Sequence, residues 1–474
     1  MSFSIPCKGR SPFDDTLAPF FSAEGLPFAN VLTAGDIAQA LADERVCFGQ
    51  TAHSLWTPAL TLWTFLSQVL SGIKSCRAAV CRAFVAVALS RPVQDCDTGN
   101  YCRARAKLPT CVLQRLTLQL GRGLEQQALA TWQWHGRSVL LVDGFTTTLP
   151  DTPANQKRYP QPKTQKPGLG CPLLRVLVLL SLATAAVQGL ALGPYQGKAS
   201  GEPSLLRTLL KQLPAGTIVL ADRFFCSYFM VALLQAHGLE AVVRQHRAWT
   251  RTFRYGVCLG VQDQRVLWPR PARPEWMDEA TYAALPETLE VRLIRKQVRQ
   301  RGYRVQNLAV VTTLLDAQEY SSADIADLYH KRWHVELDIR AIKATLHMDE
   351  LRCLTPAMVE KEIWTHFLGY NLIRKAAAQA ALLRDVHPRE ISFAASQQGV
   401  LASWSRLTEA TVAERVTLAG RFLRALGKEQ VGHRPGRCEP RAVKRRPKKQ
   451  KLLTKPRAQA RADLLAGVGV EPER

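Results

Sequence analysis

Residues 138–143 of this chain are Ser-Val-Leu-Leu-Val-Asp, and residues 217–222 repeat the pattern as Thr-Ile-Val-Leu-Ala-Asp. Each is a short apolar run that predicts a buried strand, and each ends in an aspartate. Helix-like segments at 204–213 and 228–236 lie near a third apolar run at 240–243. Strands mixed with helices in this way predict an α/β fold with a central sheet.

The apolar run at residues 173–192 is long enough to cross a bilayer as a helix. It contains Arg175, Thr184 and Gln188, and its leucines and valines fall into two groups. Two buried strands joined at residues 183–186 therefore fit it better than a membrane helix. Residues 1–10 lack the apolar segment of a signal peptide, so we expect a cytoplasmic protein with no membrane partner.

The net charge predicts a polyanionic partner. The 474 residues include 63 Lys and Arg against 39 Asp and Glu, which gives +24, while 47% hydrophobic residues exclude wholesale disorder. Much of the excess lies in two segments: residues 244–304 have thirteen basic and six acidic residues, and residues 434–461 have twelve and one. The first contains short β-like runs and predicts an inserted β-rich module, whereas the second predicts a tail that is disordered unless bound. From the charge alone, the expected partner is a nucleic acid or an anionic membrane surface. The twelve cysteines form no Cys-x-x-Cys pair, which favours free thiols.

A long helix is predicted from about residue 322 to about residue 347. At about 100° per residue, Tyr329, Arg332 and Lys343 lie within about 40° of Glu336 on one face. A carboxylate beside a phenol, a guanidinium and an ammonium suits a hard cation bordered by phosphates. A solvated face with ordinary intrahelical ion pairs has the same pattern, and the spacing alone does not separate the two.

Asp143 and Asp222 strengthen the functional interpretation, because an open α/β sheet commonly binds its ligands at the carboxyl ends of its strands. For either aspartate alone, a cap at a strand-to-helix turn is the usual explanation. Together with Glu336 they give three carboxylates that can converge. Such a set suits two Mg²⁺ ions about 3.5–4 Å apart, which act on a phosphodiester.

The spacing Tyr329-x2-Arg332-x3-Glu336-x6-Lys343 resembles the signature of bacterial insertion-sequence DDE transposases of the group numbered four. The resemblance extends over roughly residues 50–450. Its other components are Asp143-Gly144, the proline-rich residues 150–172, Asp222-Arg223, and Tyr370-Asn371-Leu372-Ile373-Arg374.

The resemblance implies a ribonuclease H-like catalytic core with a mixed sheet, interrupted by a β-rich insertion and flanked by helical N- and C-terminal regions. The expected divisions are a helical region for binding DNA ends (1–136), the first part of the core (137–243), the insertion (244–304), the second part of the core (305–350), a helical C-terminal region (351–430) and a basic tail (431–474).

The resemblance also implies a site and an activity. Asp143, Asp222 and Glu336 are the implied catalytic residues and ligands of two Mg²⁺ ions, with Mn²⁺ as a substitute. Tyr329, Arg332 and Lys343 are the implied DNA-binding residues. The implied enzyme is a transposase that cuts element ends through a hairpin and joins them to target DNA. It would act on double-stranded DNA as a homodimer in a synaptic complex, at the bacterial nucleoid.

Two alternatives remain open. One is a non-catalytic DNA-end-binding protein derived from a transposase, and the other is a host junction nuclease on the same fold. Several further residues are candidates with a structural alternative of equal or greater weight. They are Trp249, Trp268 and Trp276 for stacking a flipped base, Lys157, Arg158, Lys163 and Lys166 for phosphates, and Tyr101, Arg103, Arg105 and Lys107 for the element end. Zinc binding by His330 and His334 is disfavoured, because the glutamate of a metalloprotease helix is missing.

Overall fold

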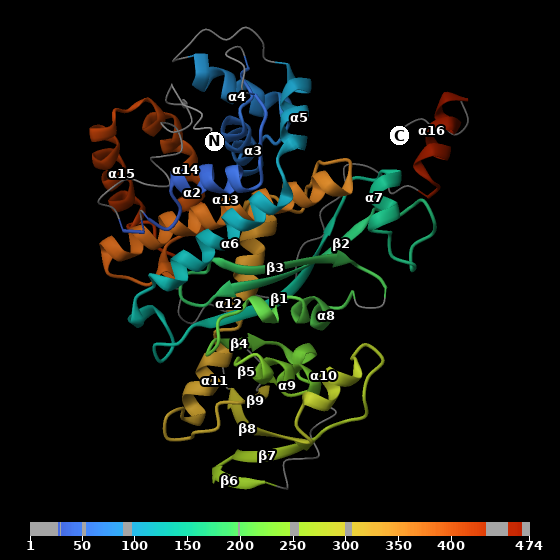
Figure 1. Ribbon diagram of the computed structural model, residues 1–474, viewed down its shortest axis with the longest axis vertical. Helices are drawn as coiled ribbons and strands as arrows, with labels where there is room; N and C mark the ends of the chain where they lie inside the picture. Colours follow the sequence, from blue (N-terminus) through green and yellow to red (C-terminus); the bar gives the residue numbers. More distant parts are fainter. Residues whose placement is uncertain are drawn as a thin grey trace, which may run out of the picture.

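The computed structural model describes residues 27–28, 30–49, 54–88, 97–197, 200–246, 256–298, 306–432 and 454–466. Within them, nine strands form one mixed sheet in the order β3-β2-β1-β4-β5-β9-β8-β7-β6. Helices from the N- and C-terminal parts of the chain gather at one end of the molecule, and β6–β8 lie at the other (Figure 1). The predicted α/β class with a central sheet is confirmed.

Five strands form the first half of the sheet: β1 (Val139–Thr148), β2 (Leu173–Ser181), β3 (Val187–Pro194), β4 (Ile218–Ala221) and β5 (Glu240–Arg244). β2 and β3 pair antiparallel with each other, and β2 pairs antiparallel with β1. β4 and β5 add in parallel on the other side of β1. The apolar run at 173–192 therefore forms two buried strands, as predicted. In the part of the chain that is described, no helix combines the length and the apolar character needed to cross a membrane.

Four further strands continue the same sheet: β6 (Val257–Gly260), β7 (Asp263–Pro269), β8 (Thr288–Val298) and β9 (Gln306–Thr312). They are antiparallel to one another, and β9 also pairs with β5. The described part of residues 244–304, which was predicted to be β-rich, holds β6, β7, β8 and a short helix, α10 (Glu279–Ala284). These strands extend the sheet of the first five strands.

The described N-terminal part is helical. Its helices are α2 (Ala34–Asp43), α3 (Pro58–Leu70), α4 (Cys76–Ala88), α5 (Thr98–Lys107) and α6 (Thr110–Gln126). All nine described cysteines are free.

The long helix α13 (Pro356–Arg384) lies between the two helical regions. It packs on α3, α6, α14 (Phe393–Glu409) and α15 (Val412–Leu426). α13 is buried on most of its circumference, because helices from both termini cover it.

Two hydrophobic cores lie on opposite faces of the sheet. One lies between the sheet and the helices that include α6, α12 (Trp333–Arg340) and α13. The other packs α8 (Glu202–Arg207) and α9 (Tyr228–Ala236) against the opposite face. Leu141 and Leu220 face the first core, whereas Leu140 and Val219 face the second, as the alternation of a strand requires.

The helix predicted for residues 322–347 is not continuous, which corrects that expectation. α11 (Ser322–His330) ends at a turn formed by Lys331 and Arg332, and α12 follows. Residues Ala341–Thr345 then form a π-helical turn, η5. The start was predicted correctly, because Ser321 and Asp324 make a capping box.

The basic tail is described only in part. Residues 434–453 lie outside the described residues, so the expectation of disorder there stays a prediction. Arg457–Leu465 form the helix α16, which overturns that expectation for this stretch. In Figure 1, α16 stands near α7 (Pro153–Arg158), at the edge of the molecule.

Candidate active site

The register of β1 and β4 brings the two candidate aspartates together. The strands run parallel with Leu141 opposite Leu220. Two residues further along each strand, Asp143 and Asp222 therefore lie opposite each other and on the face of those leucines. Asp222 follows β4 directly, as predicted, and its Oδ1 accepts a hydrogen bond from the Phe224 N–H (2.8 Å).

Asp143 was expected at the end of its strand, and this expectation was wrong. β1 continues to Thr148, because residues 140–148 pair with β2 even after the pairing with β4 has ended at Leu141. Asp143 thus lies in the middle of β1, at the point where β4 no longer covers its side. The aspartate is half-buried, and its Oδ1 accepts a hydrogen bond from the Gly144 N–H (2.8 Å).

α12 packs against β1 and brings Arg332 and Glu336 to the aspartates. The Arg332 Nη2 donates to Glu336 Oε1 at 2.9 Å, and its Nη1 lies 3.8 Å from Asp143 Oδ2. One guanidinium thus links the carboxylate on the helix to the carboxylate on the strand. The structure therefore places Asp143, Asp222, Arg332 and Glu336 in one region, as the predicted active site requires.

Lys343 lies on η5, the π-helical turn that follows α12. Its ammonium donates to the Thr146 carbonyl (3.0 Å) and lies 5.5 Å from the centre of the Phe145 ring. Despite the broken helix, the face that carries Arg332, Glu336 and Lys343 still points toward β1. The π-helical turn under Lys343 is a geometry often found at functional sites.

Tyr329 is the predicted site residue that the structure places differently. Its side chain is buried, with 7% of its surface exposed, in the last turn of α11. Burial raises the pKa of the Tyr329 phenol to about 12; Arg332 and Arg244 oppose this shift and Asp222 adds to it. Tyr329 therefore stands beside the carboxylates as a neutral phenol, and it supports the site from within the core.

The electrostatics of the site centre on Asp143. Burial raises the pKa of this carboxyl above its ordinary value, the Gly144 N–H and Arg332 lower it, and the charges of Asp222 and Glu336 raise it further. Burial alone would lower the pKa of Arg332, but Tyr329, Glu336 and Asp143 together raise it. Asp222 and Glu336 therefore both act on the charge of Asp143, and Arg332 is the cation that pairs with Asp143 and Glu336.

A fourth carboxylate, Glu202, lies at the site and was not predicted from the sequence. This residue opens α8, and its side chain covers Gly144 so closely that a Cβ on residue 144 would overlap it. Burial raises the pKa of Glu202, and so do the nearby charges of Asp143 and Asp222, while Arg175 lowers it. The only signal in the sequence was Gly144 itself, since a glycine beside a candidate aspartate marks a close approach.

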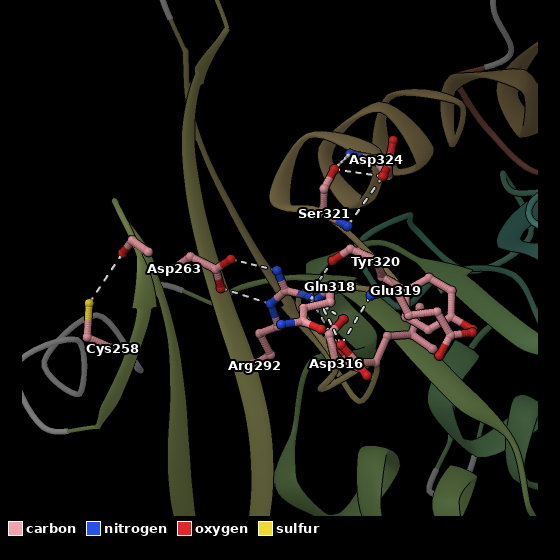
Figure 2. Close-up of polar contacts among 11 residues, drawn as sticks. Cys258, Asp263, Arg292, Asp316, Gln318, Glu319, Tyr320, Ser321 and Asp324 are labelled. Carbon is pink, nitrogen blue, oxygen red and sulfur yellow. Dashed lines mark hydrogen bonds and ion pairs between the residues drawn. The ribbon is translucent and has the colours of Figure 1, made fainter.

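The loop between β9 and α11 is held by a buried arginine, Arg292 of β8 (Figure 2). Its Nε and Nη2 donate to the two carboxylate oxygens of Asp263 at 2.8 and 2.6 Å. Its Nη1 donates to the carbonyls of Tyr320 (2.6 Å) and Asp316 (3.2 Å). Because Ser321 caps α11 immediately afterwards, Arg292 connects β7 and β8 to the start of the helix that carries Tyr329.

Among the aromatic candidates for DNA, the structure excludes two and leaves one accessible. Trp268 is 1% exposed in the second core, and Tyr101 is fully buried, where its hydroxyl donates to Gln68 Oε1 (2.7 Å). Neither is able to contact DNA. Trp276 is 47% exposed, and the guanidinium of Arg207 lies 3.8 Å from the centre of its ring. Trp249 lies outside the described residues.

The basic candidates differ in exposure. Arg103 and Lys107 are exposed on α5, whereas Arg105 is half-buried, 4.9 Å from the centre of the Phe65 ring. Four basic residues on α7 and the loop after it are all exposed: Lys157, Arg158, Lys163 and Lys166.

In the described ranges, no three His, Cys, Asp or Glu side chains are gathered closely enough to hold a metal ion as they stand. The donor set nevertheless fits a hard cation, because Asp143, Asp222 and Glu336 supply only carboxylate oxygens. Arg332 now bridges two of these groups, so binding of a cation requires this guanidinium to give way.

Comparison with known proteins agrees with this geometry. The family described as Transposase DDE domain matches residues 134–372, about half of the chain, and this range includes every carboxylate of the site. The chain is 29% identical over 358 residues to "Transposase InsG for insertion sequence element IS4" of Escherichia coli K12, covering 73% of this chain and 76% of that protein. It is also 36% identical over 64 residues to "Putative transposase InsL for insertion sequence element IS186A" of the same strain, covering 14% and 17%.

Among solved structures, the piggyBac transposase synaptic complex with hairpin DNA matches at a TM-score of 0.40 and 11% identity, over 90% of this chain and 87% of that chain. From the family match and the likeness to InsG, the chain belongs to the DDE transposases, in the group of the IS4 element.

Proposed function

We propose that Asp143, Asp222 and Glu336 are the catalytic carboxylates of this transposase and bind two Mg²⁺ ions, for which Mn²⁺ substitutes. The observation that carries the proposal is the bridge from Asp143 through Arg332 to Glu336, inside the segment that matches the family. It joins residues from a strand and a helix that are far apart in the sequence. The register of β1 and β4 adds Asp222 to them. When bound, the ions activate the attacking oxygen and stabilise the leaving oxygen of a phosphodiester.

The residues around the carboxylates have separate tasks in this proposal. Arg332 and Lys343 bind the phosphates on either side of the scissile bond, and the planar guanidinium suits two phosphate oxygens at once. Arg332 turns from the carboxylates to the phosphate when the ions and the DNA bind. Tyr329 holds Arg332 in reach from its buried position. The exposed cations at residues 157–166 contact the DNA backbone further away.

The reaction we propose is cleavage of both element ends through a hairpin, followed by transfer of the ends into target DNA. The substrate is double-stranded DNA at the terminal inverted repeats, which a homodimer holds in a synaptic complex at the bacterial nucleoid. We further propose a ribonuclease H-like class for the core. Its support is the antiparallel β1–β3 sheet with β4 and β5 added in parallel, which places the two aspartates side by side.

A cleavage assay tests the proposal. Wild-type protein is incubated with a duplex that spans an element end and its flank, with Mg²⁺ or Mn²⁺, and nicks and hairpins are resolved on a denaturing gel. Glu336→Gln should lose cleavage and retain end binding. Glu350→Gln, an exposed glutamate beyond η5, is the matched control and should cleave normally.

The same assay decides the alternatives. End binding by the wild-type protein without cleavage in either metal would identify a non-catalytic DNA-end-binding protein. Cleavage of four-way junctions in preference to element ends would identify a junction nuclease. Normal cleavage by Glu336→Gln would refute the assignment of this carboxylate.

A further inference from the structure

α12 has a second acid, Asp338, on the side opposite to Glu336. Two residues advance a helix by about 200°, so the two carboxylates point in nearly opposite directions. Glu336 is turned toward Arg332 and β1, whereas Asp338 is 2% exposed and points into the protein. A buried carboxylate requires ionic or hydrogen-bonding partners, and Asp338 has two.

Each oxygen of Asp338 binds a different arginine. Oδ1 accepts from Arg374 Nη2 at 2.7 Å, and Oδ2 accepts from Arg389 Nη1 at 2.9 Å. Arg374 belongs to α13, and Arg389 belongs to the short 3₁₀ helix η6 (Pro388–Glu390). Both guanidinium groups are largely withdrawn from solvent, with 6% and 9% of their side chains exposed.

Both arginines are also connected through hydrogen bonds to the turn between β2 and β3. Arg389 donates from Nη2 to the Ser181 carbonyl and from Nε to the Leu182 carbonyl, each at 2.6 Å. Arg374 Nε donates to the Tyr370 hydroxyl (2.9 Å), which donates to the Ala185 carbonyl (3.0 Å). Asp338 is thus tied by two routes to the turn that joins β2 to β3, and β2 pairs with β1 along its length.

Such a network adds little to the stability of a fold, because the free energy lost by removing three charges from water offsets much of their mutual attraction. The network instead fixes the orientation of the Asp338 carboxylate, and with it that of α12, since each hydrogen bond has a preferred geometry. α12 needs this. It has only eight residues, it begins at a turn, and it runs into a π-helical segment whose wider turn changes where side chains point.

We propose that Asp338 is a positioning residue, which sets the rotation and depth of α12 so that Glu336 meets Asp143 and Asp222. The catalytic role of Glu336 in this inference rests on the proposed function, whereas the anchoring of α12 by Asp338 does not. The two arginines serve as its counterparts on α13 and η6. Without the ion pairs from Asp338 to Arg374 and Arg389, α12 is able to rotate about its axis, and Glu336 moves away from the aspartates.

The test compares two variants. Asp338→Asn keeps the shape of the side chain but leaves two buried guanidinium groups without a counter-charge. Asp338→Asn/Arg389→Met removes one of these as well, which restores the net charge of the wild-type group while both routes to the β2–β3 turn remain weakened. This second variant keeps the test valid if the first does not fold.

A third variant controls for lost stability. Leu234→Ala lies on α9 in the second core, away from α12, and creates a cavity at a fully buried site. Hydrogen–deuterium exchange is measured for residues 333–345 in all variants, at a temperature where each remains folded. Single-turnover cleavage and the Kd for an element-end duplex are measured in parallel.

In both Asp338 variants, we expect faster exchange across residues 333–345, an unchanged Kd, and cleavage slower by about 10²-fold, as a small displacement of a catalytic group causes. Leu234→Ala should melt earlier but exchange and cleave normally in this region. Wild-type protection of residues 333–345 in both Asp338 variants would overturn the inference. If the wild-type protein cleaves no DNA, the proposed function fails, and the exchange data alone decide whether Asp338 anchors α12.

Discussion

Asp143 and Glu336 share one cation, the guanidinium of Arg332. Nη2 of this arginine donates to Glu336 at 2.9 Å, and Nη1 stands 3.8 Å from Asp143. The carboxylates repel each other, and the charge of Glu336 raises the pKa of Asp143. Arg332 therefore occupies the position where positive charge is most favourable. In the proposed reaction, metal ions compete with it for the same two carboxylates.

Replacement of Arg332 should separate metal binding from catalysis. In Arg332→Gln, the Mn²⁺ affinity should rise by about five- to tenfold, because loss of a unit charge near 4 Å is worth about 1 kcal/mol or more at a protein surface. DNA cleavage should fall, because the phosphate loses its guanidinium. Calorimetric Mn²⁺ titration and the cleavage assay measure the two effects. Arg340→Gln, an exposed arginine on α12, should change neither. Weaker Mn²⁺ binding in Arg332→Gln would contradict the competition.

Local patterns predicted several strands and part of the arrangement of the candidate site. The apolar runs at 138–143 and 217–222 became β1 and β4, because short runs rich in valine, isoleucine and leucine are typical of strands that are buried on both faces. The spacing of Arg332, Glu336 and Lys343 predicted one face, and the structure turns that face toward β1. Periodicity is a local property, so a single sequence displays it.

The remaining features depend on contacts between distant segments. The sequence between Tyr329 and Glu336 has no proline or glycine, so nothing in it predicted the turn at residues 331–332. α13 is buried because α3, α6, α14 and α15 surround it, and its own sequence does not show this. Glu202 reaches the site only because α8 packs beside β2 and β3. Tyr101 was a candidate for DNA until the structure placed it in the core.

Lys74 should make stability depend on pH. It lies between α3 and α4, 4% exposed, and its ammonium donates to the carbonyls of Leu346 (2.7 Å) and His347 (2.6 Å) after η5. It also lies 2.9 Å from His366 Nε2, which accepts if the ring's Nδ1 donates to the Glu362 carbonyl. Burial lowers the pKa of Lys74 from 10.5 to about 8, although the carboxylates of Glu362, Asp349 and Glu350 oppose this shift.

Between these two pKa values, the unfolded chain binds more protons at Lys74 than the folded chain does. The free energy of unfolding therefore rises with pH from about 8 to 10.5 through this group. Relative to Lys74→Met, the wild-type protein should gain on the order of 1–3 kcal/mol across this range. Urea unfolding at pH 7, 8, 9 and 10 measures the difference. Lys157→Met, at an exposed position, should show a constant difference, and the same result for Lys74→Met would refute the prediction.

Gly121 should be essential for the contact between α6 and the sheet. A Cβ at this position would overlap the carbonyl oxygen of Val187 on β3 and press on the amide of Asn371. That amide donates to the carbonyls of Thr117 (3.0 Å) and Val187 (3.1 Å), so it has little room to move. Gly121→Ala should therefore destabilise the protein by about 1–3 kcal/mol or more, although alanine favours helices.

Gly420 provides the opposite case. It lies inside α15, and the nearest atom to a Cβ built there is Arg424 Nη2 at 3.8 Å. Gly420→Ala should stabilise the protein by about 0.5–1 kcal/mol, because only helix propensity changes. Chemical denaturation should show a lower free energy of unfolding for Gly121→Ala and a higher one for Gly420→Ala. Equal effects would show that α6 does not need close contact with β3.

Arg292 should be the charged residue of strands β6–β8 on which folding depends most. Its side chain is 0% exposed, it makes a two-pronged ion pair with Asp263, and its third nitrogen holds the loop before α11 (Figure 2). Lysine retains the charge but has neither the planar fork nor enough donors in the right directions. Arg292→Lys should therefore destabilise the protein by about 3–5 kcal/mol, as a broken buried pair does.

Arg265→Lys is the matched control on the neighbouring strand β7. The Nη1 of Arg265 lies 3.6 Å from Glu290, both side chains are more than a third exposed, and the cost should stay below about 1 kcal/mol. Thermal unfolding of the two variants compares them directly. A melting temperature for Arg292→Lys as high as that of Arg265→Lys would mean that the loop before α11 is held by its own contacts, such as the ring of Tyr320 stacked on Trp134, and not by β7 and β8.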